Sequence, residues 1–157
     1  MSTTPAAIRD RIAVLVTTLS PTTDTGQPFV EHTEQEPIRE WAVANPASCL
    51  RHFSARWLPD TSPPLVTDTV AEQVERDLEI VIAYPVDWRH GNKQLVDLAT
   101  VVDEDTRKIA ITVGTEGASN LANTSATVLT TVETSEDLGP VHVGVVRLHV
   151  LYYRSNS

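Results

Sequence analysis

The chain has 157 residues, a net charge of −9 at pH 7 and a single cysteine. This length fits one domain with its own core, and a hydrophobic fraction of 41% argues against a disordered chain. The excess of acidic side chains excludes nucleic-acid binding through a broad basic surface. The lone Cys49 excludes an intrachain disulfide and a multi-cysteine zinc site.

The sequence shows no sign of export or of membrane insertion. Its first residues lack the basic start and apolar run of a secretion signal. Its apolar stretches are far shorter than the about 20 residues that cross a bilayer. We therefore predict a protein made in the cytoplasm, with no membrane partner.

The N-terminal part predicts one helix followed by short strands. Residues 5–19 repeat apolar side chains at helical spacing, with Thr4 as the N-cap and Pro5 at the first helical position. Short strands are expected at 29–30 and 38–43. Residues 49–58 alternate as a strand, which places Arg51 and Phe53 on one face and His52 and Arg56 on the other.

The second half predicts a central strand, a helix and two further strands. Residues 75–85 alternate clearly and end at Pro85, and Asn92 is expected to cap a helix that reaches Val113. Residues 108–113 fit a strand as an alternative. Strands are predicted at 126–133 and 141–154. The fold class is α+β: a single domain, 1–157, with an antiparallel sheet, two helices and exposed loops near 20–28, 59–69 and 114–125.

The search for catalytic groups favours a protein that is not an enzyme. The chain lacks a glycine-rich phosphate loop, a nucleophile elbow and a paired metal-ligand motif. Cys49 and His52 point to opposite faces of a predicted strand, as do His142 and His149, so neither pair favours a site. The segments 87–90 and 103–105 are better explained as a packed loop and a solvated helix face. We predict no catalytic residues, no metal and no cofactor.

Charge is distributed unevenly along the chain. An acidic set lies in residues 68–79 and comprises Asp68, Glu72, Glu75, Asp77 and Glu79. The segments 42–59 and 138–157 contain arginines and histidines but no acidic side chain. Separate acidic and arginine-bearing strands in one molecule favour the pairing of subunits.

The order of elements resembles the tail-terminator (tail-completion) proteins of long-tailed bacteriophages. The resemblance rests on the helix 5–19, the proline-rich loop, the strand ending in Glu79-Ile80-Val81-Ile82-Ala83-Tyr84-Pro85, and the helix 92–102. It continues to the strand pair that closes on Leu148-His149-Val150-Leu151-Tyr152-Tyr153. Extended segments at 22–36 and 59–69 depart from the family pattern.

The resemblance implies a structural protein of the virion tail and neck region. Its relatives form a homo-hexameric ring that caps the tail tube and joins it to the neck, so the implied partners are other copies, the tail-tube protein and a neck or connector protein. The implied fold carries its helices on one side of the sheet. DNA would pass through the ring without specific binding, which an acidic lumen favours.

Two sets of residues follow as hypotheses. The acidic set, or residues 103–105, is expected to face the channel. The second stripe of the last strand is too apolar for plain exposure to water, so it is expected to be covered at a subunit or intramolecular contact. The expected subunit interface comprises Arg51, Arg56, Val145, Arg147, His149 and Leu151.

Three alternatives remain open from the sequence. A head-completion or neck connector protein would share the same assembly. A small ligand-binding or enzymatic domain would gather Cys49, Asp87, Arg89 and His90 around one cleft. An adaptor would bind a host or virion protein through the loop 59–69.

Overall fold

The computed structural model describes residues 4–23, 27–59, 71–90, 94–95, 97–116 and 126–155, without the side chains of 71–73, 89–90, 94–95 and 154–155. Its main sheet has five strands in the order β1-β2-β3-β7-β6. These are β1 (Val30–Glu31), β2 (His52–Trp57), β3 (Ala71–Pro85), β6 (Ala126–Asp137) and β7 (Val141–Ser155). Among the strand pairs of the described residues, β1–β2 is parallel and the others are antiparallel. The predicted α+β class with a mostly antiparallel sheet is confirmed.

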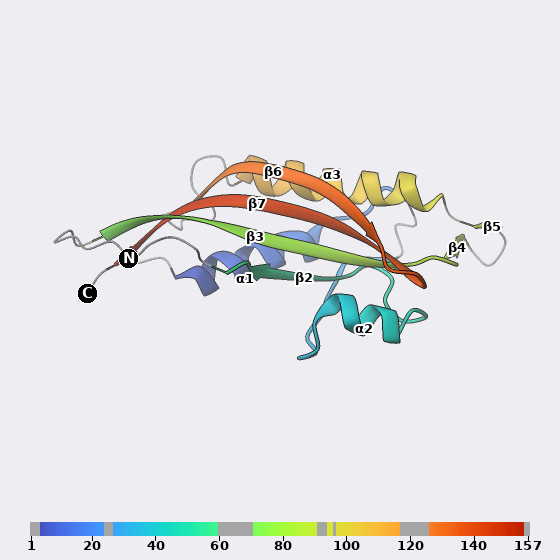
Figure 1. The fold of residues 1–157 in the computed structure, drawn as a ribbon. Coiled ribbons are helices and arrows are strands. Elements are labelled where there is room, and N and C mark those ends of the chain that lie inside the picture. Colours follow the sequence, from blue (N-terminus) through green and yellow to red (C-terminus); the bar gives the residue numbers. More distant parts are fainter. Residues whose placement is uncertain are drawn as a thin grey trace.

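Three helices pack on this sheet, where two were predicted. They are α1 (Pro5–Thr18), α2 (Ile38–Ala44) and α3 (Leu98–Glu116). Helices α1 and α3 cover one face, where Ile8, Ile12 and Ile109 pack against Leu78 and Leu148. Helix α2 covers part of the opposite face (Figure 1). The expectation that helices lie on one side only is therefore wrong.

The first helix forms as its sequence predicts. The Thr4 side chain accepts a hydrogen bond from the backbone N–H of Ala7, and Pro5 stands at the first helical position, where a missing N–H costs nothing. The buried side chains of α1 are Ile8, Ile12, Ala13 and Val16. This spacing of three to four residues is the apolar stripe of an amphipathic helix.

Residues 38–44 form α2 rather than the predicted strand. The segment, Ile-Arg-Glu-Trp-Ala-Val-Ala, is too short for its pattern to distinguish the two structures. Ile38 and Ala42, four residues apart, are buried, and they join Val81 and Val143 in a second core on the far face of the sheet. Packing on the sheet thus selects the helix.

The third helix begins later and continues further than predicted. Residues 94–95, which fall within the predicted helix, instead form β5 (Gln94–Leu95), which pairs with β4 (Arg89–His90) in a small two-stranded sheet. Asp97 acts as the cap, because its carboxylate accepts bonds from the backbone N–H and the hydroxyl of Thr100. Asn92 lies outside the described residues. Residues 108–113 remain helical, so their alternative as a strand is excluded.

The two long central strands make one face of the sheet apolar and place charged side chains on the other. In β3 and β7 the register pairs Leu78 with Leu148 and Glu79 with Arg147. Side chains two apart share a face, so the leucines belong to the core face and the charged pair belongs to the other. The alternation predicted for both strands is confirmed.

Candidate functional site

The most distinctive surface is the part of the far sheet face that α2 leaves uncovered. Helix α2 buries Val81, Ala83, Val143 and Val145 at the end of the sheet where β3 leads to β4. The remainder of β3 and β7 extends past it (Figure 1). We call this remainder the open face. Its side chains include Glu75, Asp77, Glu79, Val132, Arg147, His149, Leu151 and Tyr153.

A network of ion pairs is centred on Glu79 at the boundary between α2 and the open face. One carboxylate oxygen of Glu79 lies 3.0 Å from Arg39 Nη1, and the other lies 3.3 Å from Arg147 Nη2. Arg39 also bonds Glu136 at 2.7 Å. The Glu79 side chain is only 5% exposed, whereas Arg147 is 50% exposed. The network therefore has a buried carboxylate beneath guanidinium groups that reach solvent.

The pKa of Glu79 reflects two opposing effects. Burial alone would raise it, because a charged carboxylate loses its hydration. Hydrogen bonds and charges from Arg39, and then from Arg147, outweigh burial and hold the pKa of Glu79 below its usual range. Glu79 is therefore ionised at neutral pH.

A second network lies further along the same strands. The His149 ring contacts Asp77 Oδ1 through Nδ1 at 2.6 Å and Glu75 Oε2 through Nε2 at 3.1 Å. The hydrogen bonds to Asp77, and then to Glu75, raise the pKa of His149. The two carboxylates thus favour the charged imidazolium, which donates to both.

Apolar side chains are interspersed among these charges. Val132 pairs with Arg147 in the β6–β7 register and is 54% exposed, and Tyr153 is also exposed on β7. A surface that combines exposed apolar groups with arginine and tyrosine has the composition of protein–protein contacts. The open face is therefore a candidate interaction surface.

The expected interface residues separate into two groups. Arg56 and Arg147 are exposed, and His149 and Leu151 are partly buried on the open face. Val145 packs under α2, so its cover comes from within the chain. Arg51 is fully buried and contacts no solvent. Its assignment to a subunit interface is wrong.

Arg51 instead belongs to a cluster on the core side of the sheet. Its guanidinium bonds the Asp105 carboxylate at 2.8 Å and the backbone carbonyl oxygens of Thr23 and Gln27. The Tyr84 hydroxyl donates to the same carboxylate at 2.6 Å. Burial and the Asp105 charge raise the pKa of Tyr84 well above its usual value. The cluster ties the segment before β1 to α3.

Sequence alternation could not reveal this role for Arg51. The residue has φ of 55°, so it lies in the left-handed region, in the turn before β2. A residue in that conformation is not part of an extended strand, so the rule that side chains two apart share a face does not hold for Arg51 and Phe53.

The acidic set expected to face a channel is only partly available to solvent. Glu75 is exposed and Asp77 is partly buried, and both bond His149. Glu79 is buried beneath arginines, and Asp105 is fully buried. The expectation that these two face a channel is wrong. Asp68 lies outside the described residues, as does the side chain of Glu72.

The residues of the alternative enzymatic cleft do not form one in the part that the structure describes. Cys49 is buried in the core under α2, and burial raises the pKa of its thiol to about 11. The thiolate needed for nucleophilic attack is therefore scarce at neutral pH. Asp87 is exposed in a turn. The side chains of Arg89 and His90 lie outside the description.

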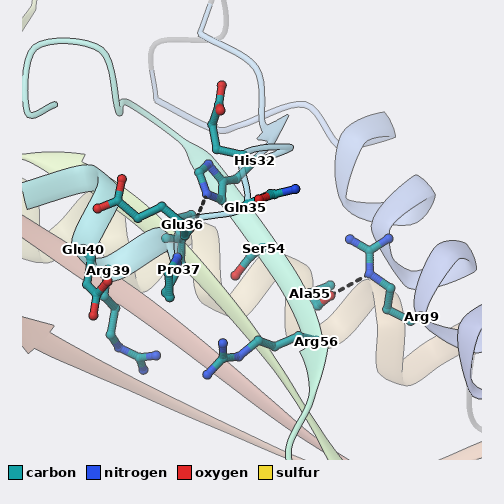
Figure 2. Close-up of a pocket in the computed structure, with 12 residues that line it drawn as sticks. Arg9, His32, Gln35, Glu36, Pro37, Arg39, Glu40, Ser54, Ala55 and Arg56 are labelled. Carbon is teal, nitrogen blue, oxygen red and sulfur yellow. Dashed lines mark hydrogen bonds between the residues drawn. The ribbon is translucent and has the colours of Figure 1, made fainter. Parts of the chain in front are cut away.

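Two of the cavities in the described part are lined by neither Cys49 nor Asp87. The larger, of about 540 Å³, lies between the segment 32–40 and β2. Figure 2 shows Arg9 at one end, bonded to the Ala55 carbonyl, and Arg39 and Arg56 at the other. The smaller, of about 320 Å³, lies between α3 and β6, where Asp103 and Glu133 line it.

The described part of the chain contains neither a cluster of metal ligands nor a helix that could cross a membrane. No group of three or more histidine, cysteine or acidic side chains there has the arrangement of a metal site. No helix there has the length and apolar character needed to cross a bilayer.

Sequence reasoning missed Arg39 and Glu136, which complete the network around Glu79. Arg39 falls in the segment predicted as a strand, and no local pattern links it to Glu136, 97 positions later. The sequence carries one weak signal for this network. Charged residues flank an apolar segment, and such a segment needs a surface to pack on. Comparison with known proteins adds no assignment, because neither a protein-family model nor a curated protein matches the chain.

Proposed function

We propose that this chain is a structural virion protein that assembles into a homo-hexameric ring. The ring caps the phage tail tube and joins it to the neck, as in the tail-terminator proteins that its order of elements resembles. The proposal treats the chain as a protein that works by contact with other proteins rather than by catalysis.

The open face is the observation that carries this proposal. Exposed Val132 and Tyr153 lie beside two ion-pair networks, on the part of the far sheet face that α2 leaves uncovered. Burying such a surface against another subunit removes apolar area from water and uses the charges to fix the register of the contact. A net charge of −9 supports a ring through which DNA passes without binding.

The test is assembly of the full chain, measured by light scattering and electron microscopy. We expect six-fold rings at millimolar protein concentration, and at lower concentration when tail tubes are present. The rings should lie at the end of the tube. A chain that stays monomeric under both conditions contradicts the proposal.

A matched pair of substitutions connects assembly to the open face. Val132→Glu places a charge on an exposed apolar residue of the open face, and Ile111→Glu does the same on the solvent side of α3, where Ile111 is 61% exposed. We expect Val132→Glu to weaken assembly by about tenfold or more, because the interface would bury a charged carboxylate in place of an apolar side chain. Ile111→Glu should leave it unchanged. Equal effects of the two would argue against this face.

A further inference from the structure

Two carboxylates of β3 lie on the open face of the sheet, and their basic partners differ in kind. Glu79 bonds Arg39 and Arg147, whose guanidinium groups keep their charge throughout the pH range of folded proteins. Asp77, two residues earlier, bonds Nδ1 of His149 at 2.6 Å. Among the described side chains, this imidazole is the only basic partner of Asp77. The charge of Glu79 is therefore always compensated, whereas that of Asp77 is compensated only while His149 carries its proton.

The groups around His149 preserve this dependence on its proton. On β3, Glu75 adds a second carboxylate, whose Oε2 lies 3.1 Å from Nε2 of the ring. On β7, Arg147 lies two residues away on the same face and is engaged with another carboxylate. On β6, the uncharged Thr130 lies opposite His149 in the register. Within the described part of the chain, no arginine or lysine thus pairs with Asp77 in place of the imidazole.

The separate chain and an assembled one solvate these groups differently. The exposed fraction of the side chain is 37% for His149 and 38% for Asp77. In the separate chain, water therefore solvates Asp77 even when the imidazole is neutral. In an interface that excludes water, a carboxylate without a charged partner is costly. The proton of His149 consequently matters more in the assembled chain than in the separate one.

We propose that His149 is a proton-operated switch for the association of this chain with further copies through the open face. With the proton in place, the imidazolium donates to Asp77 and Glu75, and the strands present compensated charges to the next copy. Without it, the contact must cover an uncompensated carboxylate and becomes weaker. This inference rests on the proposed ring, and it assigns the regulation of that interface.

The direction of the pH dependence follows from linkage. Association favours the protonated ring, so it takes up protons and weakens as pH rises through the pKa of His149. The hydrogen bonds to Asp77 and Glu75 raise that pKa above its ordinary value of 6.5. The change in association is therefore expected between neutral and mildly alkaline pH.

Assembly measured against pH tests the switch. Wild-type protein should assemble about tenfold less tightly at about pH 9 than at about pH 6, because a rise of one unit in the pKa on association corresponds to a factor of ten. His149→Gln should assemble at both pH values as weakly as the wild type does in alkaline solution. His149→Arg keeps a permanent cation beside Asp77 and Glu75, so it should assemble equally at both. Sedimentation over a concentration series measures each affinity.

His142→Gln is the matched control for the loss of an imidazole. His142 belongs to the same strand but is seven residues away, so it lies on the other face, where it lines the cavity between α3 and β6. This variant should keep the pH dependence of the wild type. Circular dichroism at both pH values checks that every variant remains folded.

The outcomes separate the two proposals. Wild-type rings that form equally at both pH values, or better at the higher one, overturn the switch and leave the ring in place. A pH dependence that persists in His149→Gln or in His149→Arg does the same. A wild-type chain that assembles at neither pH, alone or on tail tubes, overturns both.

Discussion

Two charged clusters lie on opposite faces of the same sheet, and each depends on its surroundings in a different way. On the core side, Arg51 and Asp105 are fully enclosed, with Tyr84 bonded to the same carboxylate. On the open face, Glu79 is buried but its arginine partners reach solvent. In the first cluster, loss of Arg51 or of Asp105 leaves the charge of the other in the interior. In the second, water can replace an arginine.

This contrast suggests that the two charged clusters have different roles, although both are built from arginines and carboxylates. The enclosed cluster bonds backbone carbonyls of the segment before β1 and therefore fixes the path of the chain. The network on the open face leaves Arg147 half exposed and Arg56 free within the described residues. Charges that are already satisfied stabilise one chain, whereas exposed charges remain available to a partner.

The largest expected effect comes from breaking the enclosed cluster. Arg51→Met leaves Asp105 charged and unpaired in the core, which should lower the free energy of unfolding by about 3–5 kcal/mol. Urea denaturation followed by circular dichroism measures it. Arg107→Met, on the exposed side of α3, is the control and should change stability by less than about 0.5 kcal/mol. A loss below about 1 kcal/mol for Arg51→Met would remove the contrast between the clusters.

The next effect concerns the packing that encloses this cluster. A Cβ at Gly144 would lie 2.7 Å from Thr106 Cγ2 and 3.0 Å from Val102 Cγ1, so α3 approaches β7 too closely for alanine. Gly144→Ala should cost about 1–3 kcal/mol of stability. Gly114 lies within α3, where the nearest side-chain atom to an added Cβ is 3.9 Å away. Gly114→Ala should therefore stabilise by about 0.5–1 kcal/mol. Equal effects in thermal denaturation would contradict the close approach at Gly144.

A smaller effect is expected on the open face. Glu79→Gln removes the charge that Arg39 and Arg147 bond, and it should cost about 1–2 kcal/mol at neutral pH. Because the pKa of Glu79 is lowered in the folded chain, its contribution is present above the ordinary pKa of 4.5 and is lost as pH falls through the lowered value. The stability difference between wild type and variant should therefore disappear in acid. A difference that persists in acid would assign the effect to packing.

The smallest effect is expected at His149, and its pH dependence has the opposite sign. Its folded pKa is raised, so its contribution is full below the ordinary value of 6.5 and is lost as pH rises through the raised pKa. His149→Gln should cost about 0.5 kcal/mol below that value, since the pair is exposed and screened. The cost should vanish in alkaline solution. Unfolding measured across this pH range checks the trend, and a cost independent of pH would contradict it.

The sequence predicted the strands better than the short helix, for a physical reason. Long alternating segments such as β3 and β7 repeat the same signal over many residues, and the pattern also indicated that both faces of β7 needed cover. The segment 38–44 is only seven residues long, so its choice of structure depends on packing against Val81 and Val143. The cover that the pattern required at Val145 came from this helix.

The sequence by itself determined the α+β class, the first helix and its cap, and the two faces of the long strands, because these follow from local spacing and side-chain chemistry. Only the tertiary structure decided which charges are paired. Arg51 meets Asp105 54 positions later, and Arg39 meets Glu136 97 positions later. No local pattern records such contacts, since they depend on how distant elements pack. The overall charge of −9 therefore says little until the fold shows that Arg51 is enclosed and Arg56 is exposed.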